Sequence, residues 1–477
     1  MGNQYLVISD LHLCDIEDHP DGWKAHKSSR FVFDQEFGDM LRHFVAQASQ
    51  ADRLTLIMNG DTIDFDMVTV VPEKPAWPVS FSERRRGLDA TEEKSAWKLE
   101  RVLSDHPGFM NSLAEFISGG HQLIVIMGNH DREFHFPAVQ KVFLDALKKR
   151  TTKIGGSHGD AAVRFEPWFF QVPGEIYVEH GQQYDHYSAF RYLTSPTVEK
   201  KGKEFIALPM GNLSNRYLMS RMGFFNPYSS DYILNVFSYF FHWLKKYAFT
   251  RRNLLLNWFW GSLVVMGKLL KIKKRLLSNP PDLDAAFAQI SERQALGLDT
   301  VKAIYGLQKV PITSRFYRIM REFWIDRALI ALIMTGLTIT LALVSIPLWI
   351  KLMVPLSSFP LLFFIYEWAV KGETIFTIEK HLPVVARRIS KLLDVRVVAF
   401  GHTHEPRLLP ISKNISLVNT GTWAPIMKKF DAKTLRPGMR NYLHLAFDNE
   451  QPIIRLDSWM PANLVPDRSS SEKMARE

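Results

Sequence analysis

Five short polar segments, each following a run of apolar and largely β-branched residues, constrain the fold of this chain most. They read Ser9-Asp10-Leu11-His12, Asn59-Gly60-Asp61-Thr62-Ile63-Asp64, Gly128-Asn129-His130-Asp131, Glu179-His180-Gly181 and Gly401-His402-Thr403-His404. The apolar runs predict strands over residues 5–8, 54–58, 123–127, 176–178 and 395–400. Because side chains that follow strands are presented at the edge of a sheet, we expect the five segments to converge in one cleft.

The side chains in these segments suit the binding of two divalent metal ions. They offer carboxylates, an amide and imidazoles, an oxygen and nitrogen set that borderline-hard ions favour. A carboxylate such as Asp61 has two oxygens and can join ions about 3.5–4 Å apart. Asp10 and His12 are two residues apart, so on an extended segment both would leave the same face. One such segment arises by chance, and a lone histidine there is commonly structural, but five in series indicate a metal centre.

In this order the segments resemble the motifs of the calcineurin-like metallophosphoesterases, which are D-x-H, G-D-x-x-D, G-N-H-D, H and G-H-x-H. The resemblance covers roughly residues 1–185 and 393–460. It implies an α/β fold with a two-sheet β-sandwich flanked by helices, four layers in all, and a two-metal centre at the strand ends.

The resemblance also implies which residues hold the metals, with Mn²⁺ as the first expectation and Fe or Zn as alternatives. The implied ligands are Asp10, His12 and His404 for one ion, Asn129, His180 and His402 for the other, and Asp61 as the bridge between them. A hydroxide held between the two ions would attack phosphorus while both ions neutralise the developing charge.

His130 and Asp64 match the residues that the family uses beside its metals. His130 would stabilise or protonate the departing oxygen, and Asp64 would orient the imidazole ring. Asp64 could instead cap the turn in which it lies. Of two neighbours, we expect Asp131 to tie down its own loop, whereas Arg132 could meet a phosphate or remain solvated.

Two segments are also similar to one bacterial branch of the family, the UDP-2,3-diacylglucosamine pyrophosphatases. These segments are Glu179–Asp185 and Ile8–Cys14. That branch carries arginine where His130 stands, and its chains are much shorter. The segments therefore indicate the wider family more than that particular substrate.

Charge and cysteine content indicate the environment of the chain. The net charge of +10 over 477 residues favours an anionic partner. No nucleic-acid-binding signature accompanies it, and basic clusters border apolar stretches, so we expect membrane lipid as a partner and no nucleic acid.

The single Cys14 excludes an internal disulfide. The strand begins too early for a cleaved leader, which places the catalytic domain in the cytosol; the oligomeric state stays open.

An insertion over residues 186–392 separates two parts of one catalytic domain, residues 1–185 and 393–460, and a flexible tail follows over 461–477. Within the insertion, residues 231–277 combine aromatic and aliphatic residues with clusters of Lys and Arg. This composition is typical of helices that lie in the headgroup plane of a membrane. A helical cap packed over the active site is an equal alternative, and a cap that also touches lipid satisfies both.

Residues 328–350 contain no charge and are long enough to cross a hydrocarbon core of about 30 Å. A second apolar run, residues 352–370, is interrupted by Pro355 and Pro360. The five segments can meet only if the number of crossings between them is even, so we expect a transmembrane hairpin over 328–370. The basic residues that flank it, Arg315, Arg318, Arg321 and Arg327 before and Lys371, Lys380, Arg387 and Arg388 after, place both ends in the cytosol. A buried hairpin or a re-entrant anchor are the alternatives.

Together these features predict a phosphoester or pyrophosphate hydrolase at the cytoplasmic membrane face, acting on a lipid-linked or nucleotide-linked substrate. A membrane-tethered general phosphodiesterase or nucleotidase is the alternative enzyme. A non-catalytic scaffold of the same fold is less favoured, because such relatives commonly lose ligands or the catalytic histidine and this chain keeps the whole set.

Overall fold

The computed structural model of the chain describes most of the sequence outside the tail. The described residues are 3–48, 53–156, 162–223, 226–228, 240–241, 243–245, 247–250, 252–314, 316–369, 377–427, 435–436, 439–447 and 452–459. The expected flexible tail over 461–477 lies outside them, as do residues 231–239, Arg315 and Lys371.

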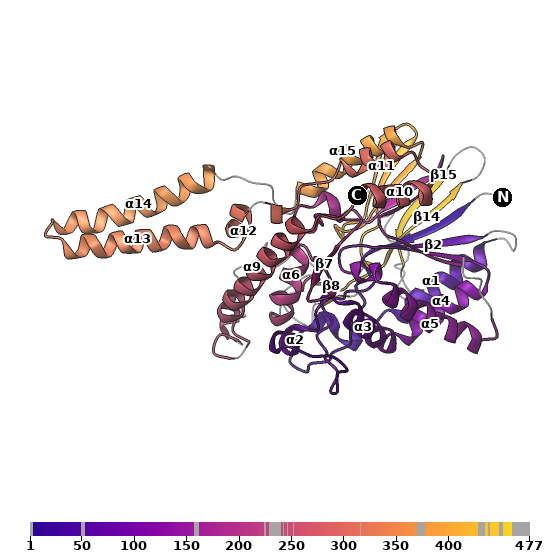
Figure 1. Cartoon of the computed structure of the whole chain (residues 1–477), viewed down its shortest axis with the longest axis horizontal. Coiled ribbons are helices and arrows are strands. Elements are labelled where there is room, and N and C mark those ends of the chain that lie inside the picture. Colours follow the sequence, from indigo (N-terminus) through magenta and orange to yellow (C-terminus); the bar gives the residue numbers. More distant parts are fainter. Residues whose placement is uncertain are drawn as a thin grey trace, which may run out of the picture.

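Two β-sheets form the centre of the molecule (Figure 1). The six-stranded sheet has the order β15 (Pro452–Ser458), β14 (Asn441–Phe447), β1 (Gln4–Ile8), β2 (Leu54–Asn59), β3 (Gln122–Ile126) and β4 (Val163–Glu166). The five-stranded sheet has the order β10 (Arg407–Ser412), β11 (Ile415–Asn419), β9 (Val397–Phe400), β6 (Ile176–Glu179) and β5 (Phe169–Val172). Two short hairpins lie outside them, formed by β7 (Thr197–Lys200) with β8 (Lys203–Ile206) and by β12 (Ile426–Met427) with β13 (Leu435–Arg436).

Alternation along the strands divides the apolar residues between two cores. Tyr5 and Val7 of β1 belong to the apolar layer between the sheets, whereas Leu6 and Ile8 belong to the layer beneath the helices. This division follows from the two-residue period of a strand, which sends successive side chains to opposite faces. Both faces of the central strands are buried, which explains why their sequences are continuous apolar runs.

Helices cover both outer faces of the sandwich. The first group, α1 (Asp34–Gln47), α3 (Glu92–Asp105), α4 (Pro107–Ser118) and α5 (Pro137–Lys153), packs over the six-stranded sheet. The second group, α10 (Leu283–Gln294), α11 (Leu298–Tyr305) and α15 (Thr377–Leu392), lies on the side of the five-stranded sheet (Figure 1). The helix–sheet–sheet–helix order confirms the predicted four-layer α/β sandwich.

The strands that precede the five polar segments are parallel within each sheet. β1, β2 and β3 run side by side in parallel, and so do β6 and β9 in the other sheet. Their carboxyl ends therefore reach the same edge of the sandwich, as the sequence predicted. The insertion leaves the domain after β6 and the chain returns through α15 into β9.

The region between Asp66 and Ala90 is less exposed than a free loop. Met67, Val68 and Leu88 are buried, and a short helix, α2 (Phe81–Arg86), forms within it. Ser80 and Glu83 make a capping box that starts this helix. The Ser-x-x-Glu pattern was a sequence signal for the helix.

Helix α9 (Leu254–Ser278) lies on the catalytic body with one face turned outward. Val265 and Leu269 are buried in the main core, where α9 packs against α6 (Met210–Tyr217). On the other face Leu255 and Leu256 are each 60% exposed. The helix is thus packed on the body and carries an exposed apolar face, a combination that agrees with a cap that also touches lipid.

Helices α13 (Ile325–Leu343) and α14 (Leu348–Ala369) form an antiparallel hairpin that projects from the body (Figure 1). With α9 they are the three described helices that are long and apolar enough to cross a membrane. No α14 residue and only Met334 of α13 is buried. Polar contacts join the hairpin at its base, where Arg327 Nε lies 2.5 Å from Glu367 Oε1 and Tyr366 contacts Asp326. The chain therefore carries a hairpin suited to membrane association.

The hairpin turns earlier than the sequence suggested. We expected a first span over residues 328–350, but α13 ends at Leu343 and α14 begins at Leu348. Pro347 explains the turn, because it lacks a backbone N–H and disfavours helical geometry at the residue before it. Pro355 and Pro360 lie inside α14. The expectation that they interrupt the second span was therefore wrong. Between them the hydroxyl of Ser357 donates to the Met353 carbonyl at 2.7 Å, which keeps polar groups paired within the helix.

Candidate metal centre

The predicted ligands lie on strand-end turns with an uncommon backbone conformation. Five of them, Asp10, His12, Asp61, His402 and His404, have φ between 51° and 68°. For residues other than glycine this left-handed region costs roughly 1–2 kcal/mol each, and such strain gathers at functional sites. The backbone at Asp10 and His12 is therefore not extended, and our expectation of an extended segment was wrong. Their side chains converge because the chain turns at both residues.

Glycines of the motifs permit the close approach of these turns. A Cβ atom on Gly60, whose φ is 78°, would lie 2.5 Å from Cγ of His180. A Cβ on Gly401 would lie 2.7 Å from Asp10 Oδ2, and one on Gly128 would clash with Asp61. The glycines are thus needed for the ligands to meet.

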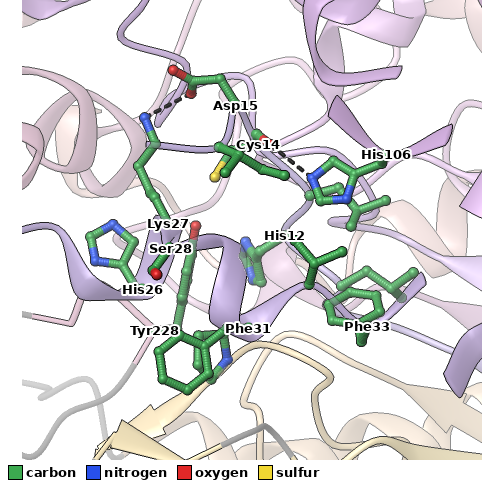
Figure 2. A pocket seen from close by; sticks show the side chains of 15 residues that line it. His12, Cys14, Asp15, His26, Lys27, Ser28, Phe31, Phe33, His106 and Tyr228 are labelled. Carbon is green, nitrogen blue, oxygen red and sulfur yellow. Dashed lines mark hydrogen bonds and ion pairs between the residues drawn. The ribbon is translucent and has the colours of Figure 1, made fainter. Parts of the chain in front are cut away.

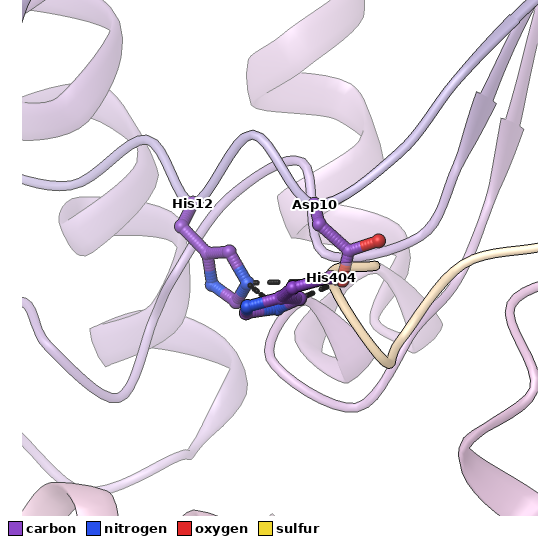
Figure 3. Close-up of side chains that lie close together, drawn as sticks. All are labelled: Asp10, His12 and His404. Carbon is purple, nitrogen blue, oxygen red and sulfur yellow. Dashed lines mark hydrogen bonds and ion pairs between the residues drawn. The ribbon is translucent and has the colours of Figure 1, made fainter. Parts of the chain in front are cut away.

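Asp10, His12 and His404 form the first cluster of candidate ligands (Figure 3). Nε2 of His12 lies 3.1 Å from Nε2 of His404, and Asp10 Oδ1 lies 3.2 Å from the latter atom. His12 and His404 are 392 positions apart in the sequence. The fold therefore brings the first and last polar segments together.

Asp61, His180 and His402 form the second cluster. Asp61 Oδ2 lies 3.0 Å from Nε2 of His180, and Asp61 Oδ1 accepts a hydrogen bond of 2.7 Å from the backbone N–H of His130. Asp61 also groups with His12 of the first cluster and with His130, the ligand atoms of the three lying within 4.8 Å of one another. It therefore lies between the two clusters, where the sequence predicted a bridge.

Hydrogen bonds on the far side of two rings leave lone pairs facing the clusters. Nδ1 of His180 donates to the carbonyl of Asn59 at 2.8 Å, and Nδ1 of His404 donates to the carbonyl of Tyr228 at 2.9 Å. Each neutral ring then presents an unprotonated Nε2 to the centre, the arrangement found in metal-binding histidines. In His402 the corresponding contact is made by Nε2, which lies 3.1 Å from Asp185 Oδ2.

Buried acceptor atoms without donors fit a pair of cations. The side-chain oxygen Oδ1 of Asn129 is buried and has no hydrogen-bond partner among the described residues. Asp10 Oδ1 and His180 Nε2 also lack a hydrogen bond there, and each faces another acceptor. Because buried acceptors that face one another are costly, this donor set fits divalent metal ions.

The charge of the centre favours uptake of cations. Burial alone would lower the pKa of His180, but Asp61 and Asp10 raise it to about 9. Burial opposes a charge on His404 too, yet Asp10 raises its pKa above the ordinary value. Without metal the carboxylates therefore draw protons to these rings, and a metal ion would replace those protons.

His130 and Asp64 lie beside the clusters as a hydrogen-bonded pair. Nδ1 of His130 lies 3.0 Å from Asp64 Oδ1. The same oxygen accepts the backbone N–H groups of Asp66 and Met67, each at 3.1 Å. Asp64 thus both orients the ring and caps the turn, so the two interpretations hold together. Burial would lower the pKa of His130, but Asp64 and Asp61 raise it well above its usual range.

The two neighbours of His130 have structural contacts. Asp131 accepts the backbone N–H of Gly128 at 2.6 Å and that of Thr62 at 2.8 Å, so it ties down the loop as predicted. Arg132 is buried and donates to the carbonyls of Pro167, at 2.7 Å, and of Leu193. Both expectations for Arg132, a phosphate contact and a solvated side chain, were wrong.

Four residues of the site carried no prediction. Asp185 orients His402, Asn212 donates to the Asn129 carbonyl at 2.9 Å and to Asp66 Oδ2 at 2.6 Å, and Tyr228 contacts His404. Asp66, two positions after Asp64, and Asp185, inside the Glu179–Asp185 segment, were visible as carboxylates near motifs. Asn212 and Tyr228 belong to the insertion, where no motif marks them.

Comparison with known proteins agrees with this geometry. The family model for calcineurin-like phosphoesterases matches residues 4–234. The match contains four of the five polar segments, and the fold brings the fifth, Gly401 to His404, to the same site. The chain therefore belongs to the calcineurin-like phosphoesterases, a family of hydrolases that act on phosphoester bonds with the help of metal ions. No curated protein matches the sequence.

Proposed function

We propose that this protein is a two-metal phosphoester or pyrophosphate hydrolase that acts at the cytoplasmic face of a membrane on a lipid-linked or nucleotide-linked substrate. One observation carries the proposal. A complete set of metal-ligand side chains and an exposed apolar hairpin belong to the same chain, and the insertion that contains the hairpin begins directly after the His180 segment.

In this proposal Asp10, His12 and His404 would hold the first ion, and Asn129, His180 and His402 would hold the second. Asp61 would contribute to both. When bound, the ions lower the pKa of water to supply the nucleophile and neutralise the phosphate charge. Mn²⁺ is the ion that we expect, because the oxygen and nitrogen ligand set suits it.

The protein's own residues position the substrate and move a proton. The His130 ring, held by Asp64, would donate a proton or hydrogen bond to the departing oxygen. The raised pKa of this ring, which Asp64 and Asp61 cause against the effect of burial, favours the protonated form that this role needs. The left-handed turns fix the ligands before substrate binds, so little reorganisation accompanies the reaction.

The orientation in the membrane follows from the charges around the hairpin. Arg318 and Arg321 precede α13, and Lys380, Arg387 and Arg388 follow α14. Because basic residues stay on the cytoplasmic side, both ends of the hairpin and the catalytic body would lie there. Packing of α9 on the body leaves α13 and α14 as the pair that crosses, which keeps the number of crossings even.

The link to an amphiphilic substrate rests on the exposed apolar side of the insertion. Phe241 is 65% exposed, Phe249 97%, and Leu255 and Leu256 on α9 are each 60% exposed. Apolar surface of this kind, next to a body that carries the metal ligands, suits a substrate with a phosphorylated head group and an apolar tail.

A phosphate-release screen tests this function. Detergent-solubilised protein with Mn²⁺ would be offered nucleotide-sugar lipids, simple phosphate esters and cyclic nucleotides, with Asp61→Ala as the inactive control. We expect release from the lipid-linked or nucleotide-linked compounds, and none from the control. Activity on none of them, or equal activity in Asp61→Ala, would refute the proposal.

A membrane-tethered general phosphodiesterase or nucleotidase is the second candidate, favoured by the way in which the hairpin projects away from the body. Deletion of the hairpin alone, residues 325–369, separates the two, because it leaves α9, α10 and α11 on the catalytic body. If the insertion guides the substrate, the deletion removes activity on lipid-linked compounds and keeps it on soluble esters. Full activity on both would support the tethered enzyme.

A further inference from the structure

Tyr228 belongs to the insertion but lies against the metal centre. Its backbone carbonyl accepts the hydrogen bond from Nδ1 of His404 at 2.9 Å, and its hydroxyl donates to Asp64 Oδ2 at 3.1 Å. Its ring packs on the ring of His12, with centroids 4.4 Å apart and planes 34° apart. One residue therefore contacts a candidate ligand from each part of the catalytic domain and the carboxylate that holds His130.

The hydroxyl and the carbonyl of Tyr228 act on different atoms of the centre. Asp64 uses Oδ1 for His130, and the Tyr228 hydroxyl donates to Oδ2, which also lies 3.4 Å from Nδ1 of His12. The hydroxyl therefore helps to fix the plane of the carboxylate. The carbonyl holds the proton of His404 on Nδ1, which directs Nε2 toward Asp10 and His12. The hydroxyl thus orients the ring of His130, and the carbonyl orients a metal ligand.

Buried contacts hold Tyr228 in this position. The side-chain oxygen of Asn226 accepts the backbone N–H of Tyr228 at 3.0 Å, while its amide donates to the Pro425 carbonyl at 2.8 Å. Asn226 is 1% exposed, so this clamp is shielded from water. The edge of His26 meets the Tyr228 ring at 5.6 Å. Figure 2 shows the two rings beside His12 around a cavity of about 30 Å³, large enough for one or two water molecules.

The segment that carries Tyr228 rests on the body at both ends. Met219 and Met222, before it, share an apolar cluster with Trp243 and Tyr247, after it, and with Trp23 of the body. The backbone N–H of Lys24 donates to the Gly223 carbonyl at 2.7 Å, which adds a polar contact at the first end. The insertion therefore docks on the body through residues that precede and follow Tyr228 in the sequence.

We propose that Tyr228 is a positioning residue through which the insertion completes the metal centre, because its carbonyl orients the ligand His404 and its hydroxyl orients the Asp64–His130 pair. This role deepens the proposed function. The part that concerns catalysis, the orientation of His130 by the hydroxyl, rests on that proposed function. The half that concerns metal binding stands on the ligand geometry alone.

Three variants test the inference in the full-length, detergent-solubilised protein. Tyr228→Phe removes the hydroxyl and keeps the carbonyl, and Asn226→Ala releases the clamp that holds the carbonyl. Tyr305→Phe is the matched control, because Tyr305 also lies in the insertion but its hydroxyl donates, among the described residues, to the Arg191 carbonyl at 3.5 Å. For each variant Mn²⁺ affinity would be measured by equilibrium dialysis with elemental analysis, and kcat and KM with a soluble chromogenic phosphate ester.

Loss of a group that orients ligands commonly costs about 10–100-fold in affinity or activity. We therefore expect Tyr228→Phe to lower kcat by about tenfold or more with KM nearly unchanged, and Asn226→Ala to weaken Mn²⁺ binding by about tenfold or more. Values equal to those of Tyr305→Phe in both variants would overturn the inference, and so would a lower melting temperature with unchanged kcat per metal-loaded molecule. If the wild type hydrolyses neither this ester nor any compound of the phosphate-release screen, the proposed function fails, and Mn²⁺ binding by Asn226→Ala still decides the role of Tyr228.

Discussion

The residues of the metal centre differ in how far the sequence revealed them. All seven proposed ligands could be named from the sequence, because each lies in a short motif at the end of an apolar run, and the fold brings six of them into two clusters. The left-handed backbone at Asp10 and His12 was not predictable, because two-residue spacing reads as an extended strand. Asn212 and Tyr228 reach the site from the insertion through tertiary packing that no local pattern records.

Replacement of His130 tests its role in proton transfer. A group that donates a proton in the transition state contributes about 10²–10⁴-fold to the rate. We expect His130→Ala to lower kcat by this order while the protein still binds its metal, because the ring of His130 is not among the proposed ligands. Elemental analysis beside steady-state kinetics checks both parts. Loss of metal together with activity would instead make His130 a ligand.

Gly60→Ala tests the close packing of the motif turns. The new Cβ would meet the His180 ring 2.5 Å away, so we expect weakened Mn²⁺ binding and a lower melting temperature. Gly174→Ala is the matched control, because its φ of 77° is nearly the same as the 78° of Gly60 and no heavy atom lies within 4 Å of its Cβ. The control isolates the backbone strain of roughly 1–2 kcal/mol. Equal effects of the two substitutions would show that the contact with His180 does not matter.

At the scale of elements, the sequence predicted best where the pattern of burial is simple. The predicted bounds of the central strands differ from the observed ones by one or two residues at most. Strands that are buried on both faces have continuous apolar sequences, which makes them easy to predict. Pro107 stands at the first position of α4, where proline is typical of a helix start. The sequence analysis predicted the hairpin turn at the wrong position, because a stretch without charges gives no hydropathy signal where the chain reverses. Pro347 was the sequence feature that marked the turn.

Asp89 joins α9 and α6 to the catalytic body and gives a pH dependence to that contact. Its Oδ1 lies 2.9 Å from Lys268 Nζ and 3.3 Å from Arg216 Nη2, and accepts the hydroxyl of Tyr217 at 2.8 Å. Burial alone would raise the pKa of Asp89, but Arg216 and Lys268 hold it well below its usual range. The ionised carboxylate therefore stabilises the fold above the unfolded value of 3.8, and this stability is lost as the pH falls below it.

We expect Asp89→Asn to lower the melting temperature clearly at neutral pH, because the cations then lose a partner in a largely buried place. The difference from the wild type should shrink as the pH approaches 3.8 and falls below it. Asp284→Asn serves as the control, since the Asp284 side chain is 80% exposed and its ion pair with Lys302 contributes little. A pH-independent difference would contradict the electrostatic explanation. Melting curves in detergent over a pH series provide the measurement.

At the scale of the whole molecule, the chain combines a soluble-type sandwich with an apolar hairpin. α13 has 19 residues, which at 1.5 Å each gives a length of about 28 Å, close to the hydrocarbon thickness of a bilayer. The ends of the hairpin return to the same body, so the separated parts of the domain can assemble on one side of a membrane.

Removal of residues 325–369 with a short polar linker in their place tests this division. We expect the shortened protein to stay in the aqueous phase of a detergent phase separation, whereas the full chain enters the detergent phase. It should keep its metal content, because no ligand lies in the hairpin. A shortened protein that still enters the detergent phase would assign membrane binding to α9 and the aromatic residues beside it.

The most direct test of the central claim, that five distant segments form one two-metal site, is the metal content of the purified full-length protein after loading with Mn²⁺ and removal of free ions. We predict two ions per chain, with the magnetic coupling in electron paramagnetic resonance that a shared Asp61 carboxylate produces, and loss of that coupling in Asp61→Ala. A protein that retains no Mn²⁺, or two ions without coupling, would contradict the account.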